Sequence, residues 1–127
     1  MVSARLIIMS SAVFLCSCDV NLFGWKAVGG GYYLDDWREG IPAYILFPPD
    51  GGSVESPTIR VEQLGWKEPL ILAQPEETRD QWVVIDTRTH QRKTISEAER
   101  TTDPAYRDIA VYHAADAWER LRRRKQW

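Results

Sequence analysis

The amino-terminal segment constrains this chain most, because it decides which part of the sequence can belong to a folded domain. A single positive charge, Arg5, precedes an apolar run from Leu6 to Leu15. One charge, then about 7–15 apolar residues, then small side chains are typical of a secretory signal peptide. The run has ten residues, whereas a membrane-spanning helix needs roughly 20. We therefore expect an export signal that takes no part in the fold.

The apolar run ends in Leu15-Cys16-Ser17-Cys18. This order resembles the lipobox of bacterial lipoproteins, with a leucine three residues before the modified cysteine and a small residue directly before it. The resemblance implies cleavage between Ser17 and Cys18, a diacylglycerol on the sulfur of Cys18 and usually an acyl chain on its new amino group. The alternatives are an ordinary secretory signal and an uncut anchor that happen to contain cysteine.

The same resemblance implies a location and a first partner. A lipidated Cys18 would tether the protein to a membrane that faces the periplasm, with the bilayer as its partner. Asp19 matches the inner-membrane retention signal of enteric lipoproteins, so the resemblance favours the inner membrane. No cofactor is expected beyond the covalent lipid on Cys18.

Length and charge limit what the rest of the chain can be. Removal of residues 1–17 leaves 110 residues, which is enough for one domain. We expect a lipidated cysteine and tether at 18–31, where Gly29-Gly30-Gly31 is flexible by composition, and a single domain at 32–127. The net charge of −2 becomes about −3 without Arg5, which does not indicate a nucleic-acid partner. Cys18 is then the only cysteine, so the core must stabilise the domain without a disulfide.

The remaining pattern predicts an α+β fold. Short runs rich in β-branched and aromatic residues, bounded by glycine and proline, indicate five or six antiparallel strands in a meander. These runs are 32–34, 43–47, 58–63, 70–73, 82–85 and 93–95. Gly65 is expected to end the strand at 58–63. Ser96 and Glu99 have capping-box spacing, and Asp103-Pro104 is a second helix-start pattern. From about His113 to Lys125 the sequence predicts an amphipathic helix packed on one face of the sheet.

Few residues have the pattern of a chemical site. His90 and His113 are the only histidines, and neither belongs to a motif with a nucleophile and a base. Asp35, Asp36 and Glu39 could bind a hard cation, but their spacing is not that of a calcium loop. Glu76 and Glu77 could form an acid–base pair, although adjacent loop residues seldom point at one target. We therefore predict no catalytic residues and no metal ligands.

Two surfaces are candidates for contact. Asp35, Asp36 and Trp37 are the predicted partner contact, because Trp37 lies in a strongly polar stretch. Arg122, Arg123, Arg124 and Lys125 are the predicted membrane-surface contact, because basic side chains attract anionic headgroups; the alternative is a solvated helix end. Trp82 and Trp118 are assigned to the core between sheet and helix. The other aromatic residues could line a groove or fill the core; these are Tyr32, Tyr33, Tyr44 and Trp66.

Beyond the lipobox, the chain resembles small single-domain bacterial lipoproteins of unknown activity in size and layout. The resemblance implies a non-enzymatic protein that binds another cell-envelope component through its sheet or loops. An immunity or inhibitor protein against an envelope-acting toxin or enzyme is the alternative. A small hydrolase is a further alternative, which the lack of a nucleophile–histidine motif disfavours.

Overall fold

A computed structural model of the protein describes residues 25–38 and 40–124. The predicted signal peptide, the lipidation site Cys18, Glu39 and Lys125 lie outside these residues. No helix of the described part is both long and apolar enough to cross a membrane.

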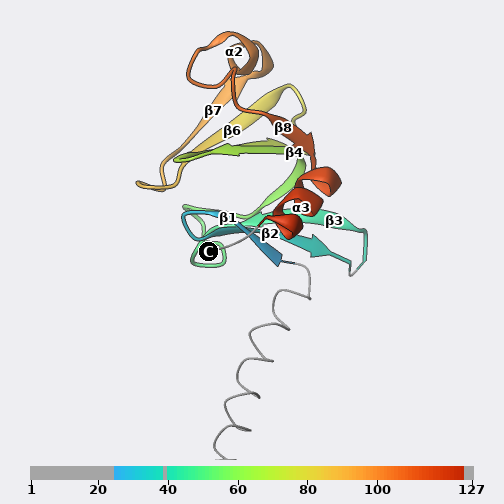
Figure 1. The fold of residues 1–127 in the computed structure, drawn as a ribbon. Coiled ribbons are helices and arrows are strands. Elements are labelled where there is room, and N and C mark those ends of the chain that lie inside the picture. The colour runs from blue at the N-terminus through green and yellow to red at the C-terminus, as the bar shows by residue number, and fades with distance from the viewer. Residues whose placement is uncertain (1–24, 39, 125–127) are drawn as a thin grey trace, which may run out of the picture.

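The described residues form a β-meander that ends in a helix, as the sequence predicts (Figure 1). All strand pairs are antiparallel, and the meander runs in the order β1 to β7, with β8 paired separately to β4. The strands are β1 Trp25–Gly29, β2 Tyr32–Trp37, β3 Ala43–Phe47, β4 Ile59–Lys67, β5 Leu70–Pro75, β6 Gln81–Asp86, β7 Arg92–Ser96 and β8 Val111–His113; the helices are α2 Glu97–Thr102 and α3 Ala114–Arg123.

The sheet bends at β4 into two layers. The first residues of β4, Ile59 and Arg60, pair with β3, whereas its later residues pair with β5 on one edge and with β8 on the other. Figure 1 shows the result, with β1–β3 in one layer and β5–β8 in the other. The main core lies between the layers, and α3 closes it with Ala114, Ala117 and Leu121. Its sheet members are Val28, Tyr32, Leu34, Leu46, Ile59, Val61, Leu64, Ile71, Ala73 and Ile85.

A second core lies on the other face of the β5–β7 layer. Leu72, Trp82, Val84 and Ile95 are buried there beneath the segment that follows α2. That segment contributes Tyr106 and Ile109. Trp82 is fully buried, as predicted, but it lies in this second core and not in the core that α3 closes, against which Trp118 is half-buried. The two tryptophans therefore belong to different cores.

The start of the domain differs from the prediction of a tether up to Gly31. Residues 25–29 form β1, which pairs with β2, and Gly30 and Gly31 form the two-residue turn between them. Both glycines have positive φ, +59° and +86°, as type I′ hairpin turns require. A side chain at Gly30 would also collide with Thr87. The triple glycine thus includes a tight turn, and the sheet begins seven residues earlier than expected.

Four local predictions, from Gly65 to the C-terminal helix, have different outcomes. The capping box is confirmed: the Ser96 hydroxyl accepts from Glu99 N, and the Glu99 carboxylate accepts from Ser96 N. Asp103-Pro104 begins a turn instead of a helix. Gly65 does not end its strand, because β4 continues to Lys67. The C-terminal helix is confirmed from Ala114 to Arg123, while Val111–His113, whose last residue was expected to begin the helix, is β8.

Candidate functional site

Strand alternation separates the three residues of the predicted partner contact. Side chains of successive strand residues point to opposite faces. Asp36 follows Tyr32 and Leu34 on the inner face of β2, whereas Asp35 and Trp37 lie on the outer face. Asp35, Asp36 and Trp37 thus contribute to two different surfaces.

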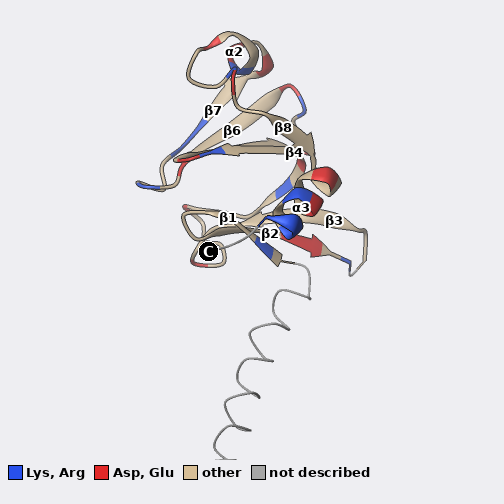
Figure 2. Ribbon diagram, viewed as in Figure 1, with Lys and Arg blue, Asp and Glu red and all other residues tan. Residues whose placement is uncertain are grey.

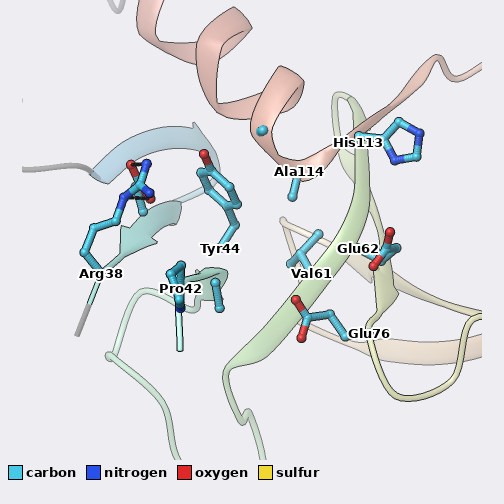
Figure 3. Close-up of a pocket in the computed structure, with 11 residues that line it drawn as sticks. Arg38, Pro42, Tyr44, Val61, Glu62, Glu76, His113 and Ala114 are labelled. Carbon is cyan, nitrogen blue, oxygen red and sulfur yellow. Dashed lines mark hydrogen bonds and ion pairs between the residues drawn. The ribbon is translucent and has the colours of Figure 1, made fainter. Parts of the chain in front are cut away.

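The inner surface is an open cleft at the start of α3, about 260 Å³ in volume, which we call the α3 cleft. Figure 3 shows Arg38, Pro42 and Tyr44 on its β2–β3 side and Glu62, Glu76 and His113 on the opposite side. The lining is completed by Asp36, Ala43, Val61, Ala114 and Ala115. The cleft forms because β2–β3 and β4–β5 diverge beyond the point where β3 leaves β4.

Ion pairs engage the carboxylates of the α3 cleft. Arg38 Nε lies 2.8 Å from Asp36 Oδ1, and the Arg38 side chain is 68% exposed. Arg60 and Arg79 do not line the cleft themselves, but they pair with its two glutamates, Arg60 with Glu76 at 3.2 Å and Arg79 with Glu62 at 3.4 Å. The carboxylates that line the cleft are therefore each paired with an arginine whose side chain reaches solvent.

Tyr44 lies between the charged groups and the core. It packs against the main core while its side chain lines the cleft. Burial, followed by the negative charge of Asp36, raises the pKa of the Tyr44 hydroxyl. A tyrosine hydroxyl is already protonated at neutral pH, so it is available as a hydrogen-bond donor to a ligand or partner.

The outer surface is a row of large apolar side chains across β1, β2 and β3. We call Trp25, Tyr33, Trp37, Ile45 and Phe47 the aromatic face. The ring centroids of Trp25 and Tyr33 are 4.5 Å apart, and those of Tyr33 and Phe47 are 5.1 Å apart and nearly parallel. Trp25 is 42% exposed and Trp37 is 38% exposed. The prediction that Trp37 is exposed is confirmed.

Asp35 occupies the middle of the aromatic face. It is the register partner of Trp25 on one side and of Ile45 on the other, with Tyr33 and Trp37 before and after it on the same face of β2. Burial among these neighbours, followed by the charge of Asp36, raises the pKa of the Asp35 carboxyl. A half-buried acid is thus surrounded by apolar side chains on this face.

The two histidines line different cavities. His90 lies in the β6–β7 turn with a φ of +63°, and its Nδ1 is 3.2 Å from the hydroxyl of Tyr32. The side chains of Tyr32 and His90 line a recess of about 460 Å³, whose other lining residues come from the segment 48–56 and include Asp50 and Glu55. His113 lies in the α3 cleft instead. Within residues 25–38 and 40–124, no group of three or more His, Cys, Asp and Glu side chains could hold a metal ion.

The two glutamates considered as an acid–base pair also have different surroundings. Glu76 lines the α3 cleft and pairs with Arg60, whereas Glu77 is exposed in the turn after β5. Neighbouring residues in this turn thus have separate environments.

The basic end of α3 has structural contacts. Figure 2 shows the arginine positions of α3, coloured blue, next to β1. Arg124 donates to the carbonyls of Ala27 and Val28, at 2.8 and 3.1 Å, and so covers backbone groups of the edge strand. Arg122 pairs with Glu119 at 2.8 Å, while Arg123 is exposed. Of these residues, Arg124 joins the end of α3 to β1, whereas the Arg122 pair lies within α3 and is exposed to solvent.

Sequence reasoning missed the aromatic face because it assigned Trp25 to the tether and offered Tyr33 only as a core or groove residue. The signal that could have found it is the period of two in β2, which places Tyr33, Asp35 and Trp37 opposite Tyr32 and Leu34. The α3 cleft has no comparable signal, because its lining comes from segments up to about 80 residues apart in the sequence.

Comparison of the chain with protein-family models, with curated proteins and with solved structures found no match.

Proposed function

We propose that this protein is a lipid-anchored, non-enzymatic binding protein of the bacterial cell envelope, which contacts an envelope protein through the α3 cleft. The observation that supports this most is the arrangement of the cleft, where Asp36 and Glu76 are held in ion pairs and the Arg38 side chain projects into solvent. Carboxylates engaged by arginine favour a recognition surface over proton transfer, because their basic oxygens already accept hydrogen bonds from cations.

The chemistry of the cleft suits a polar partner segment. Arg38 can donate to a carboxylate or a backbone carbonyl, and the hydroxyl of Tyr44 can donate a further bond. Arginine and tyrosine are enriched in protein interfaces because each combines apolar area with directed hydrogen bonds. We expect the partner to place an acceptor-rich loop at the rim of the cleft.

The anchor is proposed from the sequence order Leu15-Cys16-Ser17-Cys18. Six residues separate Cys18 from Trp25, the first residue of β1. Seven Cα-to-Cα steps span at most about 25 Å when fully extended. A lipidated Cys18 would therefore hold the domain close to a periplasm-facing membrane, and Asp19 favours the inner one.

Mass spectrometry and fractionation test the anchor. The mature protein is expected to begin at Cys18 and to carry three acyl chains, and the wild type should pellet with membranes. Cys18→Ser should leave the pellet or accumulate unprocessed, whereas Cys16→Ser should behave as the wild type. A mature protein that keeps Met1, or a Cys18 without lipid, would contradict the proposal.

Site-specific photo-crosslinking in intact cells tests the cleft. A benzoyl-phenylalanine at position 115, an exposed residue that lines the cleft, should give one discrete adduct with an envelope protein, which Tyr44→Ala should weaken several-fold. The same probe at Arg107, an exposed residue after α2, is the matched control and should give none. Equal adducts at both positions would exclude the cleft as the contact. Capture of a toxin or a lytic enzyme would instead support the inhibitor alternative.

A further inference from the structure

We propose that the aromatic face rests on the membrane, with Trp25, Tyr33 and Trp37 at the level of the phospholipid headgroups. The proposed occupant of this face is thus a phospholipid bilayer. The inference rests on the lipid anchor proposed above, and it adds an orientation for the domain.

The side chains of the face have the chemistry of a membrane interface. Tryptophan and tyrosine are enriched at both water–lipid boundaries, because their rings are apolar and carry one polar group. Trp25 and Trp37 are each about two-fifths exposed. Beside them, in the β2–β3 connection, Ile41 is 77% exposed. Ring contacts join Trp25 to Tyr33 and Tyr33 to Phe47, and exposed groups of large apolar side chains mark interaction sites.

The length of the chain before β1 selects the bilayer as occupant. Trp25 belongs to the aromatic face and follows Cys18 by only seven positions. The tether reaches at most about 25 Å, which is comparable with the width of a domain of this size, whose radius of gyration is about 13 Å. The anchor therefore keeps the β1 end of the domain nearest the lipid. In Figure 1, α2 lies at the opposite end of the molecule from β1.

Asp35 argues against a second copy of the domain as the occupant. Two copies of the domain packed through this face would bring the two Asp35 carboxylates together in an apolar contact, and desolvated like charges repel. A bilayer requires only that the carboxyl be solvated at the headgroup level or take up a proton.

Tryptophan quenching by brominated phospholipids tests the orientation. The probe is the full lipidated protein reconstituted in vesicles of phosphatidylethanolamine and phosphatidylglycerol. Wild-type fluorescence should be quenched, and a Trp25→Phe/Trp37→Phe variant should lose most of that quenching. The control is Trp66→Phe/Trp118→Phe, which removes two half-buried indoles packed against the main core. It should retain the quenching, and circular dichroism verifies that both variants are folded.

Flotation with the same vesicles separates this inference from the anchor. If the protein does not float, the lipid anchor has failed. If it floats but quenching is the same in both double variants, the anchor stands and the orientation is wrong.

The change in tryptophan quenching caused by one further substitution distinguishes a bilayer from a protein as the occupant of the aromatic face. Asp35→Asn removes the charge in the middle of the face, so it should increase quenching if lipid covers the face. If a cationic protein segment covers it instead, Asp35→Asn should leave quenching unchanged, and a photo-crosslinker at Tyr33 should capture that protein in cells. This second pattern would overturn the proposal.

Discussion

The indole Nε1 of Trp82 donates a 2.6 Å hydrogen bond to Oε1 of Glu97, and this bond joins the second core to the first residue of α2. The same carboxylate accepts two hydrogen bonds from Arg100, at 3.2 and 2.9 Å, and the Arg100 guanidinium lies 4.7 Å from the centroid of the Trp82 ring. The helix has six residues and buries none of them, so it is too short to be stable alone. Its position therefore depends on these contacts.

We expect Glu97→Ala to lower the free energy of unfolding by about 1–3 kcal/mol, because the buried indole N–H of Trp82 loses its acceptor. Urea denaturation followed by tryptophan fluorescence measures the change. Glu77→Ala, at an exposed turn position, is the control and should stay within about 0.5 kcal/mol of the wild type. Equal effects of the two substitutions would show that the bond does not stabilise the fold.

The same site predicts a pH dependence. Hydrogen bonds from Arg100, followed in smaller part by the one from Trp82, hold the pKa of Glu97 below its usual value despite some burial. A carboxyl whose pKa is lower in the folded state adds stability above its unfolded pKa and loses it as the pH falls through the folded value. The difference in the free energy of unfolding between the wild type and Glu97→Gln should therefore become smaller as the pH falls below the ordinary glutamate pKa of 4.5.

The strands predicted from sequence are those whose signal is local. Six of them appear within a few residues of the expected bounds, because each is a short run rich in β-branched, aromatic or other apolar residues. β1 was missed because Gly29-Gly30-Gly31 has the composition of a linker, and only its positive φ angles show a hairpin turn. β8 was missed because its three residues precede the helix without a break and form a strand only by pairing with β4.

The surfaces could be predicted in part. The exposure of Trp37 followed from its polar neighbours, but the order Asp35-Asp36-Trp37 does not indicate which of these residues lines the α3 cleft. That depends on where β3 leaves β4 and where α3 begins, and both are long-range properties of the fold.

Gly65 allows β8 to pair closely with β4. A side chain at this position would collide with the carbonyl oxygen of Ala110 and with Val111, where β8 pairs with β4. We expect Gly65→Ala to lower the free energy of unfolding by about 1–3 kcal/mol, the usual cost of overpacking. Hydrogen exchange should show faster exchange of the amides that pair β8 with β4.

Gly29→Ala is the matched control, because a Cβ there meets nothing within 4 Å. It should change the stability by less than about 0.5 kcal/mol. A Gly65→Ala protein as stable as Gly29→Ala would mean that β8 shifts without cost.

Arg124 covers backbone carbonyls at the edge of β1. Its side chain donates to the carbonyls of Ala27 and Val28, and a net contribution of about 1 kcal/mol is usual for such bonds. Arg124→Ala should lower the free energy of unfolding by about that amount. Hydrogen exchange should show faster exchange of the backbone amides of β1. Arg123→Ala, one residue earlier on the exposed side, should have little effect on either. Loss of stability in the second variant alone would contradict this role.

Asp35 predicts a substitution that stabilises the domain. Its pKa is raised in the folded state by burial and then by Asp36, so folding takes up protons between the unfolded and folded pKa values. Stability therefore falls as the pH rises through this interval and is lowest above it. We expect Asp35→Asn to raise the free energy of unfolding at neutral pH, on the order of 0.5 kcal/mol for a half-exposed site.

The advantage of Asp35→Asn should disappear below the ordinary aspartate pKa of 3.8, because both proteins then carry a neutral side chain at this position. Thermal melts at neutral and acidic pH measure the difference. Asp80→Asn, in the exposed turn before β6, should show no gain at neutral pH. If Asp35→Asn destabilised the domain at neutral pH, the carboxylate would have to be held by a favourable contact. The aromatic face would then be a site that keeps its charge rather than one that disfavours it.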